Sequence, residues 1–300
     1  MYMHDQHVAR ALTIAGSDSG GGAGIQADLK TMQQFQVYGT SVMTAITAQN
    51  TLGVQGIMEV DPAFVSLQLQ SVMADIGADA MKTGMLSSAA IIGEVADFLA
   101  RVTMPHVVVD PVMIAKGGAP LLRADAIFAM KERLLPLATI VTPNIPEAET
   151  LCGFSLDSWN ACRQAAFLIA DMGPDFVIIK GGHMTHDTQE WATDLIYRKN
   201  AGFTYLTTPR ILTEKSHGTG CTYSAAITAM LACGATPLQA ITTAKTYVYA
   251  ALVGAKDWDV GSGHGPIDHS VTVVHAPILP ENQRYALINN EWIPWEDEMK

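Results

Sequence analysis

Short apolar or β-branched runs alternate with segments of helical periodicity along most of this 300-residue chain. The strand-like runs are 8–15, 40–48, 54–60, 80–85, 106–110, 138–142 and 175–180. The helix-like segments between them are 25–36, 63–76, 88–101, 124–135 and 156–172. This alternation, with short turns between the elements, predicts an α/β fold in which a mostly parallel sheet is covered on both faces.

The pattern changes after Lys180. The expected elements beyond it are strands at 191–197 and 203–206, a helix from 220 and a helix over 236–254. No linker, charge block or internal repeat divides the chain, so we expect one domain over 1–270. Residues 271–300 form a C-terminal extension that carries apolar anchors but no motif that reveals its role.

Composition narrows the class of protein. Hydrophobic residues make up 49% of the chain and charged residues 16%, which excludes disorder and favours a well-buried sheet. A net charge of −11 argues against nucleic acid as a partner. No apolar stretch approaches the roughly 20 residues of a membrane helix, so we expect no membrane partner. The four cysteines show neither disulfide-like nor zinc-like spacing, which predicts a reduced, cytoplasmic protein.

The stretch 217–222 (HGTGCT) leads into an alanine-rich segment without proline, which predicts a tight loop that opens a helix. Free N–H groups and the helix dipole attract anions to such a start, so Gly218, Thr219 and Gly220 are candidates for a phosphate cradle. The same field would lower the pKa of Cys221 from the roughly 8.5 of a free thiol, which makes it a candidate proton acceptor. The alternative is a capped core helix with a small-residue start.

A glycine-rich turn, 16–24, follows the first predicted strand. It lacks the Gly-Lys-Ser/Thr ending of a Walker loop and the glycine spacing of a dinucleotide fingerprint. Asp28 falls within the apolar stripe of the next helix, so it either caps the glycine loop or faces a polar ligand held under it. Gln49 follows the next strand and either solvates a loop or binds a heterocycle, because its amide offers both a donor and an acceptor.

Polar side chains recur where the predicted strands end, and ligands bind at that edge of a parallel sheet. Asp110 and Glu147 stand at successive strand ends, and two carboxylates there suit Mg²⁺. Each has a structural alternative, Asp110 as a turn former before proline and Glu147 as a first-turn helix acid. Two carboxylates that bind a metal ion, together with a phosphate cradle, indicate phosphoryl transfer.

Three other features carry lysines. Lys180 could bind a nucleotide phosphate, and Lys245 is interpreted as part of a solvated face. The stretch 116–118 (KGG) could close over a substrate.

Five stretches form one recognisable set when they are taken together and in order. They are 16–28 (GSDSGGGAGIQAD), 48–51 (AQNT), 110–113 (DPVM), 142–147 (TPNIPE) and 217–222 (HGTGCT). The set resembles the hydroxymethylpyrimidine/phosphomethylpyrimidine kinases of thiamine biosynthesis, in the ribokinase-like superfamily. The likeness extends over 8–269, which is nearly all of the chain.

The resemblance implies a three-layer α/β/α kinase that uses ATP and Mg²⁺, usually as a homodimer. Such a kinase phosphorylates 4-amino-5-hydroxymethyl-2-methylpyrimidine and then its monophosphate. The motifs imply four groups of site residues. The pyrimidine pocket would consist of Gly16, Asp28, Gln49, Met85 and Val112. The anion hole would consist of Gly218, Thr219 and Gly220, with Cys221 in the place of the usual aspartate base. Asp110 and Glu147 would bind Mg²⁺, and Lys180, Gly182 and Lys245 would contact the nucleotide.

Two alternatives stay open. Some relatives with the same Gly-Thr-Gly-Cys loop are pyridoxal kinases, and these carry a second cysteine just before the lysine of the lid segment. Here 114–116 reads Ile-Ala-Lys, and the alanine at that place favours the pyrimidine alcohol. The other alternative is a non-catalytic pyrimidine-binding protein built on this fold. Such a protein would be expected to lose its metal acids or its anion hole, and both are intact in this chain.

Overall fold

The structure is a computed structural model that describes residues 3–4, 7–113, 124–183 and 190–295. The predicted lid, 116–118, and the alanine-bearing stretch 114–116 lie outside these residues. Within the described part of the chain, no helix is both long and apolar enough to cross a membrane.

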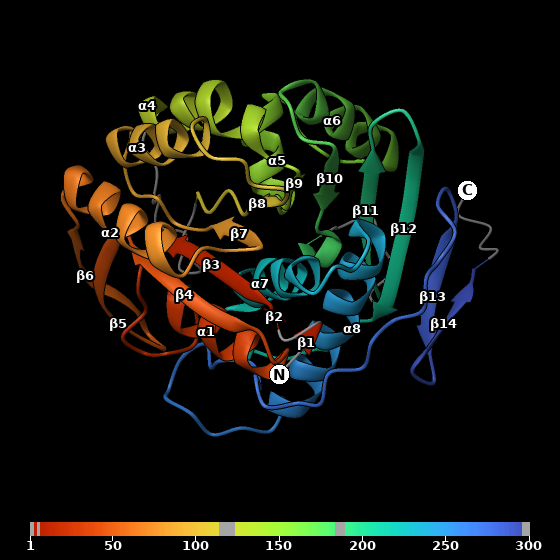
Figure 1. The fold of residues 1–300 in the computed structure, drawn as a ribbon. Helices are drawn as coiled ribbons and strands as arrows, with labels where there is room; N and C mark the ends of the chain where they lie inside the picture. The colour runs from red at the N-terminus through yellow and green to blue at the C-terminus, as the bar shows by residue number, and fades with distance from the viewer. Residues whose placement is uncertain (1–2, 5–6, 114–123, 184–189, 296–300) are drawn as a thin grey trace.

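A ten-stranded sheet forms the middle layer, in the order β14-β13-β12-β11-β10-β9-β8-β7-β3-β4 (Figure 1). Its strands are β3 (Arg10–Ala15), β4 (Tyr38–Met43), β7 (Ala80–Thr83), β8 (Val107–Val109), β9 (Ile140–Val141), β10 (Phe176–Ile179), β11 (Trp191–Arg198), β12 (Gly202–Pro209), β13 (Arg284–Ile288) and β14 (Glu291–Pro294). Neighbouring strands are parallel from β4 through β3, β7, β8 and β9 to β10, whereas β11 is antiparallel to both β10 and β12. The mostly parallel sheet and the antiparallel pair are therefore confirmed.

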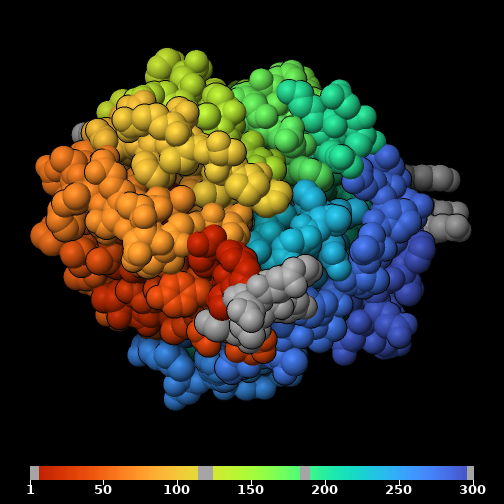
Figure 2. All heavy atoms as spheres, viewed as in Figure 1, coloured from red at the N-terminus to blue at the C-terminus, as the bar shows by residue number. Residues whose placement is uncertain are grey.

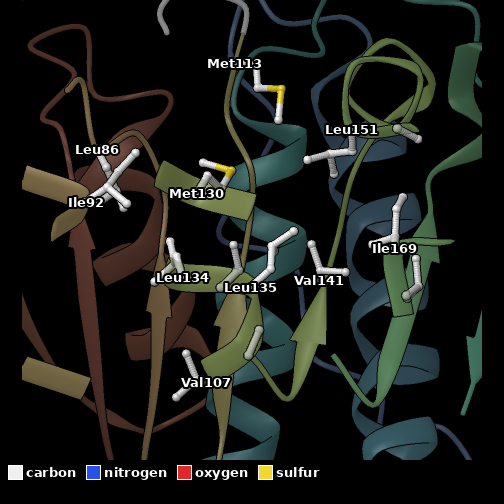
Figure 3. Packing of buried hydrophobic residues seen from close by; sticks show 14 of the residues in the cluster. Leu86, Ile92, Val107, Met113, Met130, Leu134, Leu135, Val141, Leu151 and Ile169 are labelled. Carbon is white, nitrogen blue, oxygen red and sulfur yellow. The ribbon is translucent and has the colours of Figure 1, made fainter. Parts of the chain in front are cut away.

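Helices cover both faces of this sheet, as predicted. One face carries α2 (Pro62–Asp75), α3 (Ala89–Leu99), α4 (Ala124–Ala129), α5 (Ile145–Cys152) and α6 (Trp159–Asp171), and the other carries α1 (Gly24–Gln34), α7 (Thr219–Ala232) and α8 (Pro237–Ala255) (Figure 1). In β8, Val107 (Figure 3) and Val109 pack into the first layer, and Val108 packs into the second. A strand buried on both faces needs an apolar residue at every position, which explains the continuous apolar runs.

Two predicted elements differ from the structure. The expected strand 40–48 breaks at Thr44. Its N–H makes the last bond of the ladder with β3, to the Ala15 carbonyl, and its hydroxyl donates to the Met85 carbonyl. After this break the chain leaves the central sheet as a separate antiparallel hairpin of β5 (Ala45–Asn50) and β6 (Gly53–Glu59). The expected helix 124–135 ends early as α4 and continues as a π-helical turn over Met130–Leu134.

The C-terminal extension continues the central sheet. β13 pairs in parallel with β12 at residues 205–207, and β14 folds back onto β13. On β14, Trp292 is only 8% exposed, and its indole N–H donates to the Thr246 hydroxyl of α8 at 2.9 Å. Figure 2 shows this dark-blue segment on one flank of the molecule. Buried aromatic contacts therefore hold the hairpin of β13 and β14 against α8.

Trp292→Ala is expected to lower the free energy of unfolding by about 3 to 5 kcal/mol, because truncating a buried aromatic side chain leaves a cavity. Urea denaturation followed by circular dichroism measures the change. Ile293→Ala is the matched control, because Ile293 is the next residue on the same strand and is 40% exposed. Its effect should stay within about 0.5 kcal/mol. Equal losses in the two variants would contradict the anchoring role of Trp292.

Candidate active site

The residues predicted to form a phosphate cradle, Gly218, Thr219 and Gly220, lie at the start of α7. The helix begins at Thr219, and its N-cap Gly218 has a φ of 83°. A side chain at Gly218 would collide with the Gly22 carbonyl, so the left-handed backbone and the close approach of the two glycine loops both require glycine there. The N–H of Thr219 donates to the Ser216 carbonyl at 3.4 Å. The N–H groups that follow it in this first turn lack partners within the helix, so they are available to an anion.

Asp18 ties the two glycine loops together. Its carboxylate accepts hydrogen bonds from the backbone N–H groups of Gly20, Gly22 and Ala23 at 2.8 to 3.1 Å. The same carboxylate lies 2.8 Å from Nε2 of His217, which directly precedes the cradle. Burial acts to raise the pKa of Asp18, but His217 and these N–H donors outweigh it and lower the pKa. An ionised Asp18 therefore holds the glycine-rich turn against the start of α7.

Asp28 does not cap the glycine loop, since Asp18 has that role. Asp28 is fully buried and forms an ion pair with Lys82 at 2.7 Å, and the Thr13 hydroxyl donates to it at 2.6 Å. Lys82 Nζ also lies 3.5 Å from the Cys221 carbonyl oxygen. Burial acts to lower the pKa of Lys82, but the charges of Asp28 and Asp110 raise it overall. A lysine and a carboxylate therefore lie directly beneath the cradle.

The prediction of a low pKa for Cys221 is wrong. Burial raises the pKa of its thiol to about 12, although Lys82 acts in the opposite direction. The thiol has a partly exposed position, but Asp28 and Asp110 add negative charge that further disfavours a thiolate. Cys221 lies in the first turn of α7, but the helix-start field there does not overcome the burial and the two nearby carboxylates.

The two predicted metal acids share one lysine. Asp110 Oδ1 lies 3.0 Å from Lys180 Nζ and accepts from the Thr142 hydroxyl at 3.1 Å. Burial acts to raise the pKa of Asp110, but Lys180 and Lys82 lower it overall. Glu147 forms a capping box with Asn144 at the start of α5, and burial raises its pKa to about 7, with Lys180 opposing the rise. The structure therefore brings Asp110, Glu147 and Lys180 together.

The predicted pyrimidine-pocket residues lie around the glycine-rich turn. A side chain at Gly16 would collide with the Met85 methyl group, so these two residues are in contact. Gln49 lies on the hairpin of β5 and β6 rather than at the end of a strand of the central sheet, and its Nε2 is 3.4 Å from Nε2 of His217. Val112 is half-buried, two residues beyond Asp110. Gln49 and Asp28 therefore lie on the same side of the sheet as Cys221.

Lys245 does not lie on a solvated face. It is 8% exposed, and its Nζ pairs with Asp194 of β11 at 2.9 Å. The other oxygen of Asp194 accepts from the backbone N–H of Gly181 at 3.0 Å. Gly182 is exposed, and its carbonyl accepts from Arg210 at 2.7 Å. Asp194 therefore links the three residues predicted to contact the nucleotide. It pairs with Lys245, and it binds the backbone of Gly181, which lies between Lys180 and Gly182.

The sequence predicts Asp18 and Lys82 only as polar residues at the ligand-binding edge of the sheet, with no role in the site, and it does not predict Asp194 there. A signal existed for Lys82, because a lysine that ends a buried strand needs a counter-charge and Asp28 needed one as well. Asp194 stands in an apolar strand, where a carboxylate also requires a partner. The pairing with His217 could not be read from the sequence, because 199 residues separate it from Asp18.

Comparisons with known proteins agree on one family. Residues 18–268 match the family model described as phosphomethylpyrimidine kinase. The chain is 48% identical over 263 residues to the hydroxymethylpyrimidine/phosphomethylpyrimidine kinase of Haemophilus influenzae, a match that covers 88% of this chain and 97% of that protein.

Solved structures of two kinase classes resemble the fold. The phosphomethylpyrimidine kinase from Clostridium difficile has a TM-score of 0.72 at 42% identity, covering 81% of this chain and 99% of that one. The pyridoxal kinase from Staphylococcus aureus in complex with ADP has a TM-score of 0.80 at 38% identity, covering 88% and 94%. The backbone therefore does not distinguish pyrimidine kinases from pyridoxal kinases. The sequence identity of this chain is higher to the two pyrimidine kinases, at 48% and 42%, than to the pyridoxal kinase, at 38%.

Proposed function

The chain belongs to the phosphomethylpyrimidine kinase family, and we propose that it is an ATP-dependent kinase of thiamine biosynthesis. It phosphorylates 4-amino-5-hydroxymethyl-2-methylpyrimidine and then phosphorylates the monophosphate to the diphosphate. The observation that carries this proposal is the placement of the α7 cradle and Cys221 on the same side of the sheet as Asp28 and Gln49. An alcohol held near these two residues can therefore reach a phosphate bound at the cradle.

The site suits phosphoryl transfer because that reaction depends mainly on positioning and on neutralising charge. The N–H groups of Gly218, Thr219 and Gly220 would hold the transferring phosphoryl group. Lys180 lies 3.5 Å from the position of a Cβ at Gly220, so its ammonium group is close to the cradle. The other nucleotide contacts that we propose are Gly182, in the turn that follows β10, and Lys245 of α8.

The acids at the strand ends fit a magnesium ion. Within the described residues no cluster of three or more His, Cys, Asp or Glu side chains has metal-binding geometry. Mg²⁺, however, often takes only one or two carboxylates together with phosphate and water. Glu147 is buried and its pKa is raised to about 7, so it lacks a full counter-charge that a cation would supply. Asp110 and Glu147 would hold the ion, which neutralises phosphate charge when bound.

We further propose that the chain forms a homodimer. The hairpin of β5 and β6 and the helix α2 that follows it expose several apolar side chains. They are Ile57 (48% exposed), Met58 (62%), Phe64 (55%) and Leu67 (52%). Clustered exposed apolar groups favour a protein interface.

Analytical ultracentrifugation of the wild type should give the mass of a dimer. The Phe64→Glu/Leu67→Glu variant should sediment with the mass of a monomer, because it places two charges in this apolar surface. Phe128→Glu, at an exposed phenylalanine of α4, should leave the dimer intact, and a monomeric wild type would contradict the proposal.

A competition assay tests the substrate. We expect a higher kcat/KM for the pyrimidine alcohol than for pyridoxal, and conversion of the pyrimidine monophosphate to the diphosphate. ATP turnover without an acceptor gives the background rate. A higher kcat/KM for pyridoxal would reverse the assignment, and no turnover with any pyrimidine alcohol would favour a binding protein.

Cys221 is the proposed base for the substrate hydroxyl. Its pKa of about 12 means that the thiol must first lose its own proton. The thiolate fraction, and with it kcat, should therefore rise with pH between 6 and 9. Cys221→Ala should lower kcat about 100-fold or more, while calorimetry should still detect pyrimidine binding. Cys233→Ala, at the other end of α7, is the control and should behave as wild type. Near-normal turnover in Cys221→Ala would refute the base role.

A further inference from the structure

The glycine-rich turn binds one edge of the hairpin of β5 and β6. β5 lies in a two-stranded sheet with β6, so its other edge has no neighbouring strand in the described part of the chain. Such an edge leaves backbone N–H and C=O groups without partners. Here the Ser17 N–H donates to the Ala45 carbonyl at 2.9 Å, and the Thr47 N–H donates to the Ser17 hydroxyl at 3.0 Å. The turn therefore takes the place of a third strand.

Ser19 continues this contact at Gln49 and does so with its side chain. The Ser19 hydroxyl accepts a hydrogen bond from the Gln49 N–H at 2.8 Å and donates one to the Gln49 carbonyl at 2.8 Å. One hydroxyl group therefore binds both backbone polar groups of Gln49. Because the two flanking peptide groups are held at once, the direction in which the Gln49 side chain leaves the backbone is held as well.

The ladder between β5 and β6 is irregular at the same place. Ala48 pairs with Gly56. Gln49 pairs with Val54, which leaves Gln55 as an extra residue on β6. Such a bulge disrupts the ladder locally and changes the direction of nearby side chains, and bulges are common next to active sites. The pairing with β6 therefore does not by itself fix the direction of Gln49.

The side chain of Gln49 reaches the loop that precedes the cradle. Its Nε2 lies 3.4 Å from Nε2 of His217. The glycine-rich turn also packs closely on the backbone at this point, since a Cβ at Gly20 would lie 3.4 Å from the Gln49 carbonyl oxygen. The Gln49 amide therefore lies beside the start of α7, next to the residues of the cradle.

We propose that Ser19 is a positioning residue for the acceptor: its hydroxyl holds the backbone of Gln49 so that the Gln49 amide can bind the pyrimidine ring. This inference rests on the proposed function, because it takes Gln49 to contact that ring. Ser19 is exposed and acts through Gln49, with no part in the transfer of the proton or the phosphoryl group. Its hydroxyl therefore governs how tightly the ring is bound.

Steady-state kinetics of the full chain test the proposal. Ser19→Ala should raise KM for the pyrimidine alcohol about tenfold, the effect of losing one well-placed hydrogen bond. KM for ATP should stay within about twofold of wild type and kcat within about threefold, because only ring binding is weakened. Since Ser19 is exposed, the melting temperature should fall by no more than about 3 °C.

Two further variants serve as controls. Ser19→Thr keeps the hydroxyl and should restore the wild-type KM for the pyrimidine alcohol. Ser270→Ala removes the hydroxyl of another exposed serine, which donates to Asp268 at 2.6 Å, and it should behave as wild type.

A double-mutant cycle separates a role through Gln49 from a general structural role. The Gln49→Ala variant has no amide to position. Adding Ser19→Ala to it should therefore raise KM for the pyrimidine alcohol by less than about twofold. If Ser19 only stabilised the hairpin, its removal would raise KM about tenfold in both backgrounds.

Three results would overturn the proposal. They are an unchanged KM for the pyrimidine alcohol in Ser19→Ala, an equal rise in KM for ATP, and an undiminished effect of Ser19→Ala in the Gln49→Ala background. The wild type separates this failure from a failure of the proposed function. A wild type that phosphorylates no pyrimidine alcohol contradicts both, whereas an active wild type with a normal Ser19→Ala variant contradicts only the role of Ser19.

Discussion

A fully buried ammonium group, that of Lys82, constrains the arrangement of the elements around the site. A charge removed from water costs several kcal/mol unless a counter-charge and hydrogen bonds lie close to it. Lys82 lies on β7 inside the sheet, and Asp28 of α1 provides the counter-charge at 2.7 Å. A small sliding of α1 along the sheet would leave both charges uncompensated. The position of α1, and of the glycine-rich turn that precedes it, is therefore set by this pair.

Other buried charges at the carboxyl edge of the sheet also need counter-charges, and acidic residues alternate there with lysines. Asp28, Lys82, Asp110, Lys180 and Glu147 each carry a pKa shift that includes a contribution from a neighbour in this series. Lys82 interacts with Asp28 and Asp110, and Lys180 interacts with Asp110 and Glu147. Three carboxyl groups therefore share two ammonium groups beneath the cradle, so negative charge is in excess. A cation at the end of the series would balance that excess, and this is the electrostatic reason for two carboxylates and a phosphate cradle to lie together.

The periodicity of the sequence predicted the layers, because buried parallel strands and amphipathic helices leave local patterns. The start of α7 was predictable for the same reason, since its glycines and alanines are contiguous. Features that depend on distant partners were not predictable. The break at Thr44 needs carbonyl groups from two other segments, and the burial of Lys245 needs Asp194 on a different element. For Cys221 the contiguous sequence contains the helix field, which lowers a thiol pKa, but not the burial and the distant carboxylates that raise it, so the predicted direction of the shift is wrong.

The hairpin of β13 and β14 also changes what the sheet presents to other molecules at its border. Without it, β12 would be the last strand, with eight residues of backbone available to pair with a strand from another chain. The border is instead β14, which has four residues and ends in proline. Short border strands and proline both discourage intermolecular strand addition. The extension therefore gives this side of the sheet a short border strand in place of a long one.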